Sequence, residues 1–166
     1  MLTYFAYGSN MLLARLRERV PSADPIGTAI LTEHRLLFHK RSRDGSGKGN
    51  ILATGDSKDE VHGVVYEILD TEKPSLDLAE GLGTGYFEKV VRLSVNETWA
   101  EAFTYFANDE FIDDVLKPYA WYKDFVLFGA QENNLPPEYI AAIEAVESVV
   151  DQDSEREELN RRILTG

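Results

Sequence analysis

Leu2-Thr3-Tyr4-Phe5-Ala6-Tyr7-Gly8-Ser9-Asn10 opens the chain with an apolar, aromatic run that ends at a glycine. Such a run favours a β-strand over Leu2 to Tyr7. Asn10 is a residue type that commonly caps the start of a helix, and the apolar spacing after it predicts a short amphipathic helix that ends before Pro21. A strand followed so soon by a helix indicates a fold that mixes both.

The rest of the chain extends this mixture. Aromatic and β-branched runs predict further strands at Ile26–Leu31, His34–His39, Ile51–Thr54, Val61–Leu69, Tyr86–Val95 and Trp99–Phe106. Helical spacing predicts one helix that ends at Gly81, one that starts at Pro118, and one from Glu138 to about Val150. The glycine-rich stretch Lys40–Asn50 predicts a mobile loop. We expect an α+β fold with about six or seven mostly antiparallel strands.

Length and charge restrict the classes of function. A chain of 166 residues suits one hydrophobic core, so we predict a single domain over residues 1–150 and a charged tail or surface helix over residues 151–166. The net charge of −12 argues against nucleic acid or a membrane as a partner, and no run reaches the roughly 18 apolar residues that span a bilayer. The absence of cysteine fits a cytoplasmic protein. The sequence is compatible with a homodimer.

The turn Tyr7-Gly8-Ser9-Asn10 is the first feature that can carry chemistry. At a strand-to-helix junction, backbone N–H groups without partners can face an anion or a developing oxyanion, and glycine lets a ligand approach closely. An ordinary capped turn explains the tetrapeptide equally well.

Glu80 is the second such feature, because it lies at the end of a predicted helix, directly before Gly81. The C-terminus of a helix carries partial negative charge, so a carboxylate there is electrostatically disfavoured. A glutamate in that setting can act as a general base and then as a general acid near neutral pH. A solvated glutamate before a capping glycine is the simpler explanation from spacing alone.

Four separated motifs follow one another between Tyr4 and about Tyr139. They are Phe5-Ala6-Tyr7-Gly8-Ser9-Asn10-Met11, Glu60-Val61-His62-Gly63-Val64-Val65-Tyr66, Leu76-Asp77-Leu78-Ala79-Glu80-Gly81, and Trp121-Tyr122-Lys123 followed by Gly129-Ala130-Gln131-Glu132-Asn133-Asn134-Leu135-Pro136. In this order they resemble the γ-glutamylcyclotransferase family. The last motif is similar to the branch of that family that acts on γ-glutamyl amino acids.

The resemblance implies a small cyclotransferase-like β-barrel with peripheral helices, no metal and no organic cofactor. It implies that Glu80 is the catalytic proton acceptor and that Tyr122 contacts the substrate. The implied substrate-binding loop consists of Tyr4, Phe5, Ala6, Tyr7, Gly8, Ser9 and Asn10. The implied reaction releases 5-oxoproline and a free amino acid from a γ-glutamyl amino acid. Glutathione or a γ-glutamylamine as substrate, and a non-catalytic module that binds a small molecule, stay open as alternatives.

At Tyr86 the sequence departs from the family pattern. The family places a pocket tyrosine where Phe87 falls in this chain, and a shift of one residue in a strand turns a side chain to the opposite face. Either a local bulge returns Tyr86 to the pocket, or this chain lacks that hydroxyl contact.

Other polar clusters carry weaker signals. The spacing of His34, His39 and His62 matches no ligand pattern, so no metal site is expected. Basic residues around the predicted loop form either a solvated hairpin tip or a rim that attracts the carboxylates of a substrate. They are Arg35, His39, Lys40, Arg41, Arg43 and Lys48.

Overall fold

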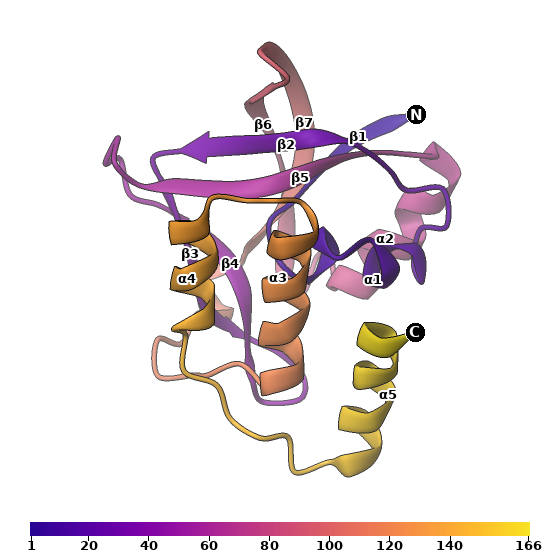
Figure 1. The fold of residues 1–166 in the computed structure, drawn as a ribbon, viewed down its shortest axis with the longest axis vertical. Coiled ribbons are helices and arrows are strands. Elements are labelled where there is room, and N and C mark those ends of the chain that lie inside the picture. The colour runs from indigo at the N-terminus through magenta and orange to yellow at the C-terminus, as the bar shows by residue number, and fades with distance from the viewer.

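Five of the seven strands pair into a closed barrel in the order β1-β5-β2-β6-β7 (Figure 1). In the computed structural model, which describes residues 1–166, these strands are β1 Leu2–Ala6, β2 Asp24–Thr32, β5 Glu60–Ile68, β6 Tyr86–Val95 and β7 Thr98–Ala107. Neighbouring strands pair antiparallel except β1 and β7, which meet in parallel where Tyr4 faces Phe103. The predicted mostly antiparallel barrel with peripheral helices is confirmed.

The remaining strands, β3 His34–Arg41 and β4 Gly47–Ala53, form a separate two-stranded sheet. The prediction of a mobile loop over Lys40–Asn50 is therefore wrong for most of that stretch. The turn between the strands is held by Asp44, whose carboxylate accepts hydrogen bonds from Ser46 and Lys48. A Cβ atom at Gly47 would lie 2.2 Å from the carbonyl oxygen of Phe38, so glycine serves close strand contact here.

Helices surround one side of the barrel (Figure 1). They are α1 Leu13–Arg17, α2 Lys73–Glu80, α3 Ala120–Glu132, α4 Pro137–Glu144 and α5 Ser154–Thr165, with 3₁₀ turns η1 Ser9–Met11, η2 Asp70–Glu72 and η3 Asp109–Phe111. The predicted early helix is divided into η1 and α1, and α4 ends before the predicted Val150. Gly81 ends α2 with a left-handed φ of 68°, as predicted. No helix combines the length and apolar character needed to cross a membrane.

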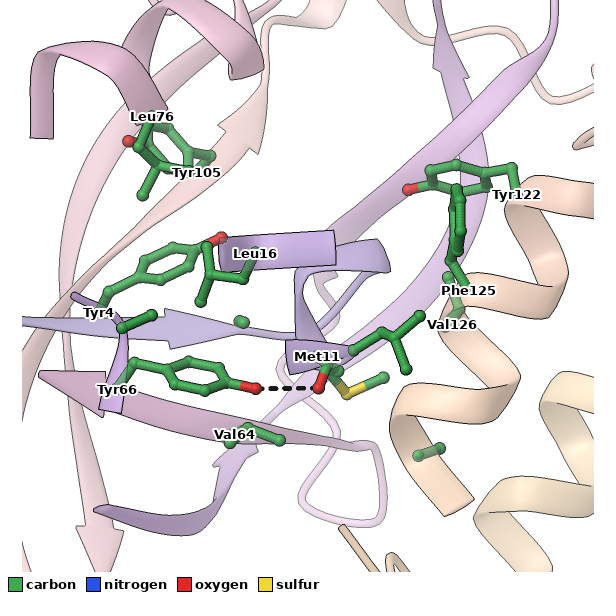
Figure 2. Close-up of a cluster of buried hydrophobic side chains, with 14 of the residues drawn as sticks. Tyr4, Met11, Leu16, Val64, Tyr66, Leu76, Tyr105, Tyr122, Phe125 and Val126 are labelled. Atoms are coloured by element: carbon green, nitrogen blue, oxygen red, sulfur yellow. Dashed lines mark hydrogen bonds between the residues drawn. The ribbon is translucent and has the colours of Figure 1, made fainter. Parts of the chain in front are cut away.

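The turn after β1 is fixed from two sides by the largest hydrophobic core cluster. From the barrel, the hydroxyl of Tyr66 donates a 2.9 Å hydrogen bond to the carbonyl of Met11 (Figure 2). From the helical side, α3 approaches so closely that a Cβ atom at Gly129 would lie 2.6 Å from the backbone nitrogen of Leu12. Met11 and Phe125 are fully buried between these layers. Tight packing on both sides therefore holds the turn in one position.

The end of the chain is tied to α3. Asp151 is buried, and its carboxylate accepts hydrogen bonds from the indole of Trp121 at 2.9 Å and from the guanidinium of Arg156 at 2.6 and 2.7 Å. Arg161 on α5 reaches Asp124 on α3 at 2.9 Å. Residues 151–166 thus contain a surface helix that is anchored by ion pairs (Figure 1).

Candidate active site

A small cavity lies beside the turn that follows β1. Its walls come from β4, α2, β6, β7 and α3 as well as from the turn. The lining residues are Tyr4, Tyr7, Gly8, Ser9, Asn10, Gly49, Glu80, Tyr86, Tyr105 and Tyr122. The fold therefore brings the predicted turn, Glu80 and Tyr122 together around one space, which we call the inner cavity.

Two of the residues predicted to bind substrate do not line this cavity. Phe5 and Ala6 are fully buried, and each belongs to a different core cluster. Their neighbours alternate between the same two clusters, as expected for a strand whose successive side chains point to opposite faces. The structure gives Phe5 and Ala6 a packing role in β1.

The two carboxylate oxygens of Glu80 differ in their surroundings. Oε1 accepts a hydrogen bond from Asn10 Nδ2 at 2.8 Å and one from Arg19 Nη1 at 3.0 Å. Arg19 also donates to Asn10 Oδ1 at 3.1 Å, so the three side chains form a closed triangle. Oε2 accepts no hydrogen bond from the protein. One oxygen is thus anchored, and the other is free to exchange a proton with a ligand.

Arg19 changes the electrostatic setting expected for Glu80. The end of α2 presents only partial negative charge to Glu80, whereas Arg19 supplies a full positive charge at 3.0 Å. The Arg19 and Glu80 side chains are only 20% and 17% exposed, so water screens this pair weakly. The carboxylate is therefore held in place by charge-assisted hydrogen bonds.

Backbone N–H groups in the turn are available to a ligand. The N–H groups of Gly8, Ser9 and Asn10 donate no hydrogen bond within the protein, whereas those of Met11 and Leu12 bond to carbonyls within the turn. Gly8, Ser9 and Asn10 also line the inner cavity. Donors fixed in this way suit a carboxylate or the oxyanion of an acyl-transfer intermediate.

Two tyrosines hold the peptide of Gly49 at the cavity wall. The hydroxyl of Tyr86 donates to the Gly49 carbonyl at 2.6 Å, and the Gly49 N–H donates to the hydroxyl of Tyr122 at 2.9 Å. Burial raises the pKa of Tyr122 to about 12 and holds the pKa of Tyr86 well above its usual range. Both side chains are therefore neutral phenols at physiological pH, and Tyr122 keeps its proton for donation.

Tyr86, and not Phe87, faces the cavity. Tyr86 is buried, whereas Phe87 is 43% exposed and stacks on Phe106. The pairing of β6 with β7 runs without a register shift from Tyr86 onward, so no bulge in that pairing is involved. The departure from the family pattern therefore leaves a tyrosine hydroxyl in the cavity wall.

Three residues of the site were not found from the sequence. Arg19 falls within the predicted early helix, and Gly49 falls within the predicted mobile loop. Tyr105 lines the cavity while its hydroxyl donates to Asp77 at 2.6 Å. No local pattern distinguishes these residues, because only the tertiary fold brings them to the site.

The three histidines are not brought together. His39 contacts Asp114 and Asn50, whereas the ring of His62 lies 4.7 Å from that of Tyr139. No group of three or more His, Asp or Glu side chains is arranged to hold a metal ion.

Comparison with known proteins places this chain in a family. Residues 60–143 match the AIG2-like family. Gamma-glutamylcyclotransferases from Homo sapiens and Bos taurus are 33% and 32% identical to the chain over 147 residues, which is 87% of this chain and 78% of each relative. A solved structure of a gamma-glutamyl cyclotransferase has a TM-score of 0.86 and 30% identity, with 99% of both chains covered. The chain belongs to the gamma-glutamylcyclotransferase family.

Proposed function

We propose that this protein converts a γ-glutamyl amino acid into 5-oxoproline and a free amino acid. The observation that carries the proposal is Glu80, which holds Oε1 on Asn10 and Arg19 and leaves Oε2 free beside a turn of unpaired N–H groups. Relatives at 33% identity are named gamma-glutamylcyclotransferases, which supports the same reaction for this chain.

The reaction is an intramolecular aminolysis. The α-nitrogen of the substrate forms a bond to the γ-carbonyl carbon, and the bond from that carbon to the amide nitrogen breaks. Two protons pass from the α-ammonium group to the departing nitrogen, which leaves as an ammonium group. Since the nucleophile belongs to the substrate, the enzyme has to fold the substrate back on itself and move protons.

The site offers a group for each task. The small inner cavity, walled by tyrosines, favours a folded glutamyl group. The N–H groups of Gly8, Ser9 and Asn10 suit either its α-carboxylate or its γ-carbonyl oxygen. Glu80 Oε2 accepts a proton from the amine and delivers it to the leaving nitrogen. Because Oε1 is anchored, this oxygen keeps its position through both transfers.

The partner in this proposal is a small molecule. The inner cavity is lined by five tyrosines, by Glu80 and by the turn Gly8–Asn10, and such a mixture of aromatic and polar groups is typical of small-molecule sites. A net charge of −12 disfavours nucleic acid and anionic lipid as partners. The absence of cysteine fits a reducing compartment, so we place the activity in the cytoplasm.

The proposal is tested by incubating the protein with γ-glutamyl-alanine and measuring 5-oxoproline by mass spectrometry. The variant Glu80→Gln keeps the shape of the side chain but removes the base, so kcat falls by about 10²- to 10⁴-fold. Glu67→Gln, at an exposed glutamate on β5, is the matched control and retains activity. Full activity in Glu80→Gln overturns the role of Glu80. Absence of product from every γ-glutamyl compound overturns the reaction class.

A further inference from the structure

A second cavity adjoins the inner cavity, and we call it the outer cavity. The two share Ser9, Glu80, Tyr86 and Tyr122 as walls. The other walls of the outer cavity are Arg15, Arg19, Lys40, Ser42, Lys48 and Ala79. Four cations therefore line one cavity in a protein whose net charge is −12.

Only part of this positive charge is neutralised by the protein. Arg19 pairs with Glu80 at 3.0 Å, and Lys48 pairs with Asp44 at 3.0 Å. Arg15 and Lys40 have no carboxylate within hydrogen-bond distance. Arg15 faces only the distant carboxylate of Glu18, at 3.9 Å, and Lys40 joins no ion pair. Two positive charges are thus incompletely neutralised within the protein, and they come from different elements, α1 and β3.

Lys40 lines the outer cavity but not the inner one. Its ammonium group donates no hydrogen bond and joins no ion pair, and it lies 4.7 Å from the centre of the Tyr86 ring and 5.8 Å from that of Phe111. Partial burial lowers the pKa of Lys40. A partly desolvated ammonium group without an anionic partner gains from a ligand carboxylate.

Arg15 also has few hydrogen-bond and ion-pair partners. Its Nε is buried without a hydrogen bond, and Nη1 reaches only Asn160 Oδ1 at 3.5 Å and Glu18 at 3.9 Å. The guanidinium group lies 4.9 Å from the centre of the Phe125 ring. Burial lowers the pKa of Arg15 to about 10, so the group stays charged at neutral pH.

The geometry places the leaving group of the substrate in the outer cavity. If the glutamyl group fills the inner cavity, its γ-amide has to face Glu80 for proton transfer. Glu80 belongs to the wall that both cavities share. Whatever is attached to the amide nitrogen then extends among Arg15, Lys40 and Lys48. This step rests on the proposed function.

We propose that the outer cavity selects leaving amino acids that carry two carboxylates, as in γ-glutamyl-glutamate and γ-glutamyl-aspartate. The α-carboxylate of the leaving group neutralises one of the two available cations, and the side-chain carboxylate neutralises the other. A leaving group with one carboxylate leaves one cation unpaired, and a plain amine leaves both. Arg15 and Lys40 are the specificity-determining residues.

The test compares kcat/KM for γ-glutamyl-glutamate, γ-glutamyl-alanine and γ-glutamyl-ethylamine. We expect kcat/KM to be highest for the glutamate compound, about tenfold lower for the alanine compound and about tenfold lower again for the ethylamine compound. Each carboxylate contributes because hydrogen bonds between charged groups are stronger than those between neutral groups. Raising the salt concentration compresses these steps because it screens charge. Equal kcat/KM values for the glutamate and alanine compounds overturn the inference.

The variant Lys40→Gln tests whether this cation is responsible. It lowers the ratio of kcat/KM for the glutamate compound over the alanine compound about tenfold, whereas Lys40→Arg keeps most of the ratio. Because both substrates are measured on one preparation, the ratio does not depend on the fraction of folded protein. Lys58→Gln, at an exposed lysine, is the control and leaves the ratio unchanged. An unchanged ratio in Lys40→Gln overturns the assignment of Lys40.

Failure of the reaction class can be told apart from failure of the selectivity. Calorimetric Kd values for the same compounds follow the same order if the outer cavity recognises carboxylates, even where no product forms. Binding in that order without product keeps the inference and overturns the proposed reaction. Product formation without that order of preference overturns the inference and keeps the proposed reaction.

Discussion

At Glu80, a single nitrogen of Arg19 contacts both the carboxylate and the side chain of Asn10. Arg19 is therefore a positioning residue, because it fixes the orientation of the group that moves the proton. Asn10 completes the same arrangement from the turn. A carboxylate held at one oxygen by two donors loses little entropy when it reacts at the other.

Replacement of Arg19 is expected to lower kcat more than it changes KM. Arg19→Gln removes one charge-assisted hydrogen bond to Glu80, so we expect kcat with γ-glutamyl-alanine to fall about tenfold to a hundredfold. Arg19→Lys keeps the charge and restores part of the loss. Arg162→Gln, at an arginine whose side chain is 69% exposed, is the control. A kcat unaffected by Arg19→Gln contradicts this role.

The structure differs most from the prediction made from the sequence in the hairpin of β3 and β4. Gly47 and Gly49 occur in a polar, glycine-rich stretch, which is a local signal for a loop. In the fold, Gly47 lies against Phe38 of the neighbouring strand, and Gly49 leaves room for the hydroxyl of Tyr122. Both contacts are non-local, so composition in a short window cannot distinguish them from loop glycines.

In contrast to that hairpin, β1 and the end of α2 could be predicted from local sequence. The first strand follows from local rules and is found, although it ends at Ala6, one residue before the predicted Tyr7. The end of α2 at Gly81 also follows from local rules and agrees with the structure. The family motifs then identified Glu80 and Tyr122, which the structure brings to one cavity. Arg19 has no motif of its own, and its proximity to Glu80 depends on how α1 packs.

The hydrogen bond from Tyr86 on β6 to Gly49 on β4 is expected to increase activity. Tyr86→Phe removes the 2.6 Å bond that holds the Gly49 carbonyl, and the cavity wall loses a fixed position. We expect kcat/KM to fall about tenfold, as for one hydrogen bond to a buried group. Tyr139→Phe is the control, because its buried hydroxyl has no hydrogen-bond partner. Equal activity in the two variants contradicts the expectation.

On the scale of the whole molecule, the two cavities are assembled from elements that lie far apart in the sequence. The barrel brings β1, β6 and β7 together, and α3 lies on the helical side of the barrel (Figure 1). Tyr122 of α3 completes the lining of the inner cavity. The outer cavity adds Arg15 and Lys40, whose charges meet only after folding. The basic residues around the predicted loop fall into two groups. Lys40 and Lys48 line the outer cavity together with Glu80, whereas Arg35 forms an ion pair with Asp59.

Asp151 is expected to stabilise the whole fold, since it joins the tail to α3. Arg156 holds the pKa of Asp151 well below its usual range through hydrogen bonds. Asp151→Ala leaves Trp121 and Arg156 without their acceptor, and we expect Tm to fall by about 5–10 °C at pH 7. Gln152→Ala, at the exposed neighbour, is the control.

The contribution of Asp151 depends on pH in a defined direction. A carboxylate with a depressed pKa in the folded state stabilises the protein above its unfolded pKa of about 4, and this stability is lost as the pH falls through the folded value. The difference in Tm between wild type and Asp151→Ala is therefore constant from about pH 5 to pH 8 and shrinks below about pH 4. A difference that grows on acidification contradicts the ion-pair explanation.

In the proposed reaction, the substrate's own amine attacks its γ-carbonyl while Glu80 moves the proton. The most direct measurement is product analysis after turnover of γ-glutamyl-alanine in water enriched in ¹⁸O. Cyclisation yields 5-oxoproline without ¹⁸O and an equal amount of alanine, because no water enters the reaction. Formation of glutamate with ¹⁸O in its γ-carboxylate would show hydrolysis and would contradict the account.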